Sequence, residues 1–259
     1  MSRIAHALLL AVATVCIVAP SASANPDNRL GGTLGATAQS TGNPGILPPT
    51  SRPYGKSYGE WSAKHWQWEY SLPVDHHPLF DTADCSAGQS GPVWFLGGTF
   101  IVTPISTGGV IGIATRDCTV PVGKALFFPI IDAECSTAEG DGTTEQQLRD
   151  CAVGLVDHAV NLSAEVDGVA VQNLAAFRVQ SPLFTWGPLP ENNVFQDPVN
   201  LPAGTTSPSV SDGYFLMLAP LSVGSHTIHF KGSAVFTQAQ DGFDFIFSLD
   251  ITYHLMVTG

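Results

Sequence analysis

Charged residues are scarce in this sequence, and basic residues are the scarcer kind. Only 12% of the 259 residues are charged, with 10 Lys or Arg against 22 Asp or Glu, which gives a formal net charge of −12. A field of that sign repels the phosphates of nucleic acids and anionic lipids, and no cluster of basic residues opposes it. We therefore expect no nucleic-acid partner and no electrostatic docking on a membrane surface.

Several motifs of common enzyme classes are also missing. The sequence has no G-x-S-x-G nucleophile elbow, no phosphate-binding loop and no dinucleotide fingerprint. It has no C-x-x-C pair of the kind that holds structural zinc. After residue 24, no stretch approaches the roughly 18 uninterrupted apolar residues of a transmembrane helix. The sequence thus predicts no transmembrane segment, no serine hydrolase with a nucleophile elbow and no phosphate-loop or dinucleotide-binding enzyme.

The first 24 residues have the pattern of a secretory signal peptide. Arg3 provides the positive start, an apolar run follows from Ala7 to Val18, and A-S-A at positions 22–24 forms a cleavage signal. Cleavage leaves nine basic against 22 acidic residues, a net charge near −13. We expect a secreted protein, extracellular or periplasmic, with its mature chain starting at Asn25.

Cysteine usage agrees with export. Loss of Cys16 with the signal peptide leaves an even set: Cys85, Cys118, Cys135 and Cys151. An even number of cysteines in an oxidising compartment predicts two disulfides. Three pairings are possible, and we favour Cys85–Cys118 with Cys135–Cys151 because each closes a loop of moderate length.

The mature chain divides into a spacer and one large domain. Residues 25–56 are rich in Pro, Gly, Ser and Thr and lack apolar periodicity, which predicts a flexible spacer. Residues 57–259 are patterned throughout, and about 200 residues suit a single β domain or two closely packed sheets.

Strand patterns dominate that domain. All eight odd positions from Phe243 to Val257 are apolar, while the even positions include Asp, Ser, Thr and His, so one face of this strand is buried. Other short apolar runs are bounded by Gly, Pro or Asp-Gly turns. The sequence predicts a mainly β fold, an antiparallel β-sandwich or a jelly-roll-like domain.

Two short helices are expected, at about 57–72 and about 144–159. Ser57 with Glu60 has the form of a capping box, and Thr144 with Gln147 opens the second helix in the same way. We assign Glu60 to the cap rather than to acid–base chemistry. Trp61 and Trp68 share an apolar helical stripe and are expected in the core.

Trp66 and Tyr70 are the candidate ligand-binding aromatics. They point away from the stripe of Trp61 and Trp68, and they could form a partly exposed surface on which a sugar ring stacks. The alternative is that they pack in a second part of the core. A ligand site here would also include the neighbouring His76, His77 and Asp81.

The candidate metal site lies in the segment 75–81, which reads D-H-H-P-L-F-D. His76, His77 and Asp81, with His65 from the preceding helix, are residue types that hold zinc, copper or iron. Adjacent histidines in extended chain point to opposite sides, so two ligands require a turn there. The alternative is a loop in which one His caps the sheet and Asp81 bonds within a turn.

Four segments resemble a family of secreted bacterial proteins. They are W-S-A-K-H-W-Q-W at 61–68, G-P-V-W-F-L-G-G at 91–98, V-P-V-G-K-A-L-F-F-P at 120–129 and L-S-V-G-S-H-T-I-H-F at 221–230. The resemblance covers most of the chain after residue 57. It implies an exported bacterial protein and supplies no activity or site residue.

Three functions remain in competition at this point. The leading hypothesis is an extracellular or surface binding module for carbohydrate or cell-wall material. The first alternative is a secreted hydrolase or oxidase that uses a metal held near His76, His77 and Asp81. The second alternative is a structural surface protein without a small ligand.

Overall fold

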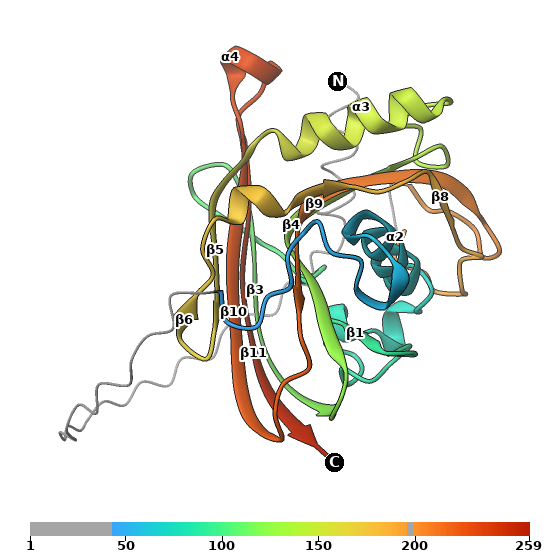
Figure 1. The fold of residues 1–259 in the computed structure, drawn as a ribbon. Coiled ribbons are helices and arrows are strands. Elements are labelled where there is room, and N and C mark those ends of the chain that lie inside the picture. The colour runs from blue at the N-terminus through green and yellow to red at the C-terminus, as the bar shows by residue number, and fades with distance from the viewer. Residues whose placement is uncertain (1–42, 196–198) are drawn as a thin grey trace, which may run out of the picture.

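The computed structural model describes residues 43–195 and 199–259 (Figure 1). The predicted signal peptide and most of the predicted spacer therefore lie outside the described residues. Strands make up most of the regular structure, as the sequence predicts.

The strands are β1 Val93–Phe95, β2 Thr103–Pro104, β3 Gly109–Pro121, β4 Ala125–Ser136, β5 Ala159–Val166, β6 Val169–Ala170, β7 Arg178–Gln180, β8 Phe184–Trp186, β9 Ser207–Leu218, β10 Gly224–Phe236 and β11 Phe245–Thr258. The α-helices are α2 Tyr58–Glu69, α3 Glu145–Val156 and α4 Gln238–Asp241. Short 3-10 helices are η1 Pro53–Gly55, η2 Val74–His76, η3 Pro78–Phe80 and η4 Leu174–Phe177.

These strands form two mixed sheets. The first has the order β1-β4-β9-β7, with β8 also pairing with β9, and the second has the order β2-β3-β11-β10-β5-β6. The expectation of purely antiparallel sheets is wrong, because β1 pairs with β4 and β3 pairs with β11 in parallel. Period-2 alternation identifies a buried face but carries no information on the direction of the neighbouring strand.

The two sheets pack against each other, and α2 covers the opposite face of the first. Phe128 of β4 stacks on Phe230 of β10 at 5.3 Å between ring centroids, which joins the sheets. The neighbouring residue Phe127 points the other way and contacts Tyr58 of α2 at 5.8 Å. Figure 1 shows the resulting order, with α2 on the side of β4 and β9 away from the long strands of the second sheet.

Both long helices begin where their capping boxes predict. The Ser57 hydroxyl accepts the Glu60 N–H and the Glu60 carboxylate accepts the Ser57 N–H, so Glu60 has the structural role expected of it. Thr144 and Gln147 make the same pair of contacts at the start of α3. The helices end at Glu69 and Val156, a turn short of the predicted limits, because 3-10 turns and β5 follow directly.

The end of the predicted spacer is packed on the first sheet. Ile46 forms a β-bridge with Leu218, and the Leu47 N–H donates to the Met217 carbonyl at 2.8 Å. The buried Tyr58 hydroxyl donates to the Leu47 carbonyl at 2.6 Å and accepts the Met217 N–H at 3.2 Å. Residues 43–56 thus belong to the folded domain, and the ordered part begins upstream of residue 57.

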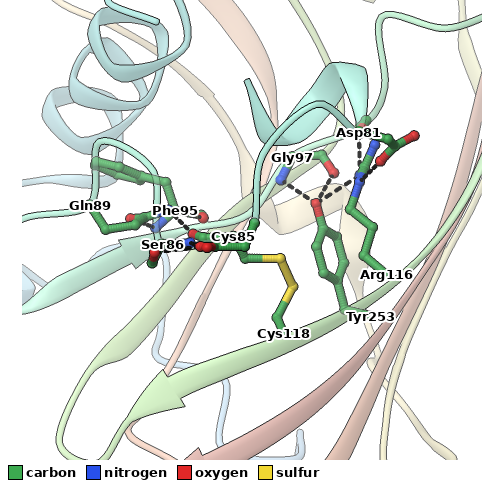
Figure 2. Close-up of a disulfide and its surroundings, with 11 residues drawn as sticks. Asp81, Cys85, Ser86, Gln89, Phe95, Gly97, Arg116, Cys118 and Tyr253 are labelled. Carbon is green, nitrogen blue, oxygen red and sulfur yellow. Dashed lines mark hydrogen bonds and ion pairs between the residues drawn. A yellow bond between two sulfur atoms is a disulfide. The ribbon is translucent and has the colours of Figure 1, made fainter. Parts of the chain in front are cut away.

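The structure contains two disulfides, with the favoured pairing. Cys85–Cys118 ties the segment before β1 to β3 (Figure 2), and Cys135–Cys151 ties β4 to α3. Within residues 43–195 and 199–259, no helix has the length and apolar character needed to cross a membrane.

Candidate functional site

A cavity of about 190 Å³ opens beside β4, where that strand loses its neighbour. The short strand β1 pairs only with Ala125–Phe127 of β4, and β9 occupies the other edge. The following residues therefore line the cavity along this unpaired edge: Pro129, Ile131, Asp132, Ala133 and Glu134. Pro129 suits this edge because it has no N–H to leave unsatisfied.

The walls come from both sides of this edge. Helix α2 contributes Trp66, Glu69 and Tyr70, which share one face because they are three and four residues apart. The second sheet contributes an apolar wall that includes Phe236 and Phe247. The remaining walls are the segment 98–100, the end of α3 and residues 194–195.

Four carboxyl groups line the same cavity: Glu69, Asp132, Glu134 and Glu139. Asp132 and Glu134 are two residues apart on β4, so they emerge on the same face of the strand. No Lys, Arg or His belongs to the lining within the described residues. The cavity is therefore acidic and aromatic, without a fixed cation to balance it.

Glu134 is the best-supported of the four carboxyls. It accepts hydrogen bonds from the Tyr70 hydroxyl at 3.0 Å, from Trp186 Nε1 at 2.8 Å and from the Ser209 hydroxyl. Burial raises the pKa of Glu134, and these donors act in the opposite direction by favouring the ionised form. Burial is the larger effect, so the pKa of Glu134 stays raised although this carboxyl has the most donors in the cluster.

Glu139 is hydrogen-bonded to Glu134 and to the Ser136 hydroxyl, the latter at 2.6 Å. Burial and the neighbouring Glu134 charge raise the pKa of Glu139 well above its usual value. Two close carboxyls of this kind share a proton more readily than both ionise. Glu139 in its neutral form donates to Glu134, which makes the pair carry one negative charge.

Glu69 and Asp132 have much weaker support. In the part of the chain that the structure describes, no hydrogen-bond donor reaches the Glu69 carboxyl, and its nearest basic atom is His65 Nδ1 at 3.5 Å. Asp132 Oδ2 is buried and has no hydrogen-bond partner. Burial raises the pKa of Glu69 well above its usual value and that of Asp132 to about 8, with the nearby carboxyls adding to both shifts.

Trp66 and Tyr70 lie together at this cavity. Their ring centroids are 5.3 Å apart, and Phe195 contacts Tyr70 at 4.8 Å. Trp66 is partly exposed and its Nε1–H is buried without an acceptor, whereas Tyr70 is buried. The two predicted aromatics thus form a cavity wall rather than an open platform.

The predicted metal residues do not come together. His77 is fully buried, where its Nε2–H donates to the Glu69 carbonyl at 2.9 Å and its Nδ1 accepts the Leu79 N–H at 3.1 Å. Both ring nitrogens are therefore occupied by backbone groups, and burial lowers the pKa of His77 to about 4. His76 is exposed, and His65 Nε2 contacts the Leu96 carbonyl at 2.8 Å.

Asp81 belongs to a different network (Figure 2). Its carboxylate accepts from Arg116 Nε at 2.6 Å, and Arg116 Nη1 donates to the Gly98 carbonyl and to the Tyr253 hydroxyl. The Tyr253 hydroxyl in turn donates to the Gly97 carbonyl at 2.8 Å. This network holds the segment 97–100 against the second sheet and so positions one wall of the cavity.

One group of potential metal-ligating atoms occurs within the described residues: Cys135, Asp141 and Cys151. The two cysteines are bonded to each other, so their sulfurs are not free thiolates. The Asp141 carboxylate accepts the Ser136 N–H at 2.9 Å. This group is a disulfide with an adjacent turn.

A serine, a histidine and an aspartate also meet on the surface. His226 Nδ1 contacts Asp167 at 2.7 Å, and His226 Nε2 lies 3.3 Å from the Ser222 hydroxyl. The same Nε2 contacts the Ser222 carbonyl at 3.0 Å, an acceptor that requires a proton on this nitrogen. Hydrogen bonding to Asp167 raises the pKa of His226, so the ring bridges two acceptors rather than acting as a base.

The carboxyl cluster was missed from the sequence, although part of its signal is visible there. The stretch P-I-I-D-A-E-C-S of β4 places two acids at alternate positions in an otherwise apolar strand. Such a pattern is typical of a solvated strand face. Only the position of α2 over that face reveals that Asp132 and Glu134 line a cavity.

Comparison with known proteins adds little to this geometry. No protein-family model matches the chain, and the comparison with curated proteins gave no match. The crystal structure of the cysteine protease inhibitor EhICP2 from Entamoeba histolytica is 14% identical, covers 57% of this chain and 96% of its own, and has a TM-score of 0.19. The structure of PbICP-C in complex with falcipain-2 is 12% identical, covers 65% of this chain and 100% of its own, and has a TM-score of 0.20. Similarities this weak carry no argument about fold or function.

Proposed function

We propose that this protein is an exported binding protein with a β-sandwich scaffold, and that it holds one ring of a carbohydrate or cell-wall component in the cavity beside β4. Export is supported by the signal-peptide pattern and by two disulfides. The combination of aromatic faces with hydrogen-bonding carboxyls is the chemistry that recognises a hydroxylated ring.

The observation that carries this proposal is the set of unpartnered polar groups in the cavity. Glu69 and Asp132 line the cavity, and within the described residues no hydrogen-bond donor reaches the Glu69 carboxyl or Asp132 Oδ2. Leaving a buried polar group unpaired costs about 1–3 kcal/mol. A ligand that supplies donors to these carboxyls offsets this cost on binding.

The size of the cavity limits the ligand. A closed cavity of roughly 150 Å³ is known to hold benzene, so about 190 Å³ accommodates a single six-membered ring with small substituents. A polysaccharide chain would enter only by its terminal residue. We therefore expect the affinity for a polymer to depend on its number of chain ends.

Calorimetry and pull-down with the mature protein test this proposal. Monosaccharides are titrated into the protein, and retention is measured on insoluble polysaccharides and peptidoglycan. Trp66→Ala should weaken binding about tenfold or more because it removes a stacking wall. Tyr54→Ala is the matched control, since Tyr54 is an exposed aromatic outside the cavity. Absence of binding to every ligand by a natively folded protein would overturn the proposal.

A second candidate is an enzyme that cleaves the bound sugar by acid–base catalysis. It is favoured by the raised pKa of about 8 at Asp132, which keeps that carboxyl protonated near neutral pH and able to donate a proton. Release of the phenol from aryl glycosides, abolished in Asp132→Asn, is the expected result. Turnover that persists in Asp132→Asn would exclude this role.

A further inference from the structure

The cavity is lined by more hydrogen-bond acceptors than donors. The most deeply buried of its carboxyls, that of Glu69, is 5% exposed and receives no hydrogen bond within the described residues. Its only close basic neighbour is His65, whose pKa burial lowers to about 4, so that ring is neutral near pH 7. Among residues 43–195 and 199–259, no cation pairs with the Glu69 carboxyl at the cavity.

Aromatic rings surround the same space. Trp66 and Tyr70 are in contact, and Tyr70 also contacts Phe195 and Trp186, the latter at 5.5 Å. The faces of such rings attract cations, and Trp is the best of them. Carboxyls and aromatic faces together favour a positively charged ligand group over a neutral or anionic one.

We propose that the ligand ring carries a protonated amine, which makes it an amino sugar, and that Glu69 and Asp132 bind the ammonium group. This inference rests on the proposed function. An ammonium supplies several N–H donors, and within the described residues no donor reaches the Glu69 carboxyl or Asp132 Oδ2.

A metal ion fits this cavity less well. In the described chain, the one group of potential ligand atoms that all lie within 4.8 Å of one another involves Cys135 and Cys151, away from the cavity. The four cavity carboxyls do not converge in that way. Separate acceptors around an apolar space suit an organic cation with a ring attached.

Proton release accompanies this mode of binding. A bound ammonium favours the ionised form of Asp132, so a proton passes from that carboxyl to the buffer. The ionisable groups around Asp132 are Glu69 and Tyr70 from α2, Glu134 from β4 and Glu139 from the following turn. The walls from α3, β5, β10 and β11 are apolar, and Asp212 of β9 is paired with Arg178.

Three sugars with the same ring test the inference: D-glucosamine, N-acetyl-D-glucosamine and D-glucose. They are titrated into the mature protein at about pH 6.5, where an amine of this kind is protonated. D-Glucosamine should bind about tenfold or more tightly than the two neutral sugars, because its donors are charged. Titrations in buffers of different ionisation enthalpy should show proton release for D-glucosamine alone.

Neutralising variants show where the preference originates. Glu69→Gln and Asp132→Asn keep the shape of each side chain, and each should reduce the preference for D-glucosamine while D-glucose binding persists. Glu165→Gln is the matched control, since Glu165 is an exposed carboxyl on β5 outside the cavity. If one of these two variants does not fold, the other variant still tests the inference, as does the proton-release measurement on the unchanged protein.

Two other outcomes separate the proposals. Equal or tighter binding of the neutral sugars overturns the amine inference and leaves the proposed function standing. Absence of binding for all three sugars, with the protein folded, overturns the proposed function and this inference with it.

Discussion

The indole N–H of Trp186 donates a 2.8 Å hydrogen bond to Glu134 Oε1, and both side chains are buried. Trp186 lies on β8 and Glu134 on β4, and these strands pair with β9 rather than with each other, meeting it together at Ser209. The bond therefore joins two strands of the sheet that do not pair directly, and its acceptor Glu134 lines the cavity. It also fixes Glu134, the carboxyl with the most donors.

Loss of this bond should destabilise the protein. Trp186→Phe removes the N–H and leaves Glu134 with one donor fewer, at a cost of about 1–3 kcal/mol in the free energy of unfolding beyond the loss of ring volume. Trp94→Phe is the matched control, because Trp94 is buried and its Nε1–H has no partner. Urea unfolding of the two variants should differ by that amount, and equal losses would contradict the role given to the bond.

Stability should fall as pH rises above about 6.5. The folded pKa of Asp132 is about 8, above its unfolded value of 3.8, so its contribution is complete below the unfolded value and is lost as pH rises through about 8. Glu69 and Glu139 act in the same direction, as does His226. Thermal unfolding between about pH 6.5 and about pH 8 measures the decline.

Asp132→Asn should flatten this decline because the amide does not ionise. Below about pH 6.5 the buried His65 and His77 act in the opposite direction, since their folded pKa of about 4 lies under the unfolded value of 6.5. Their contribution is present above 6.5 and is lost as pH falls toward 4. If the melting temperature of the unchanged protein stays constant or increases from about pH 6.5 to about pH 8, the prediction is wrong.

The two disulfides should contribute similar amounts. Cys135 and Cys151 are 16 residues apart and Cys85 and Cys118 are 33 apart, so loop-closure entropy gives about 3 and about 3.7 kcal/mol. The double Cys→Ser variants should lose these amounts in urea unfolding, with the longer loop losing slightly more. Rapid labelling of thiols in the unreduced native protein would show that the bonds are not formed.

His77 should be required for stability and not for metal binding. His77→Ala removes two hydrogen bonds to backbone groups and should cost about 2–3 kcal/mol, whereas His76→Ala should change stability by less than about 0.5 kcal/mol. Added zinc should not change the melting temperature of the unchanged protein or of either variant. An increase in melting temperature with zinc that is lost in the His76→Ala, His77→Ala double variant would support the metal-site hypothesis instead.

Local structure was predictable wherever a short-range pattern determines it. Ser57 and Thr144 each begin a helix because the capping partner is three residues away in the sequence. The alternation from 243 to 257 predicts β11 because a buried strand face needs nothing beyond period 2. The pairing of the cysteines follows from loop length.

The acidic cavity was not predictable because it depends on long-range placement. Glu69 and Asp132 meet only because α2 lies over the face of β4 that carries the acids, and no local pattern encodes that contact. The metal site expected at the histidines of segment 75–81 likewise depends on contacts that the local sequence does not encode. His77 looks like a ligand until the Glu69 carbonyl and the Leu79 N–H are seen to occupy its ring.

The position of β11 has a consequence for the order in which the molecule assembles. This strand ends at Thr258 and lies between β3 and β10, with Gly109 of β3 beside Ile246. A chain that emerges N-terminus first, from a ribosome or a translocation channel, therefore holds β3 without this partner until Phe245–Thr258 has followed. Pairing over such a sequence separation is slow, so we expect the second sheet to be completed late in folding, after β10 and β11 have both emerged.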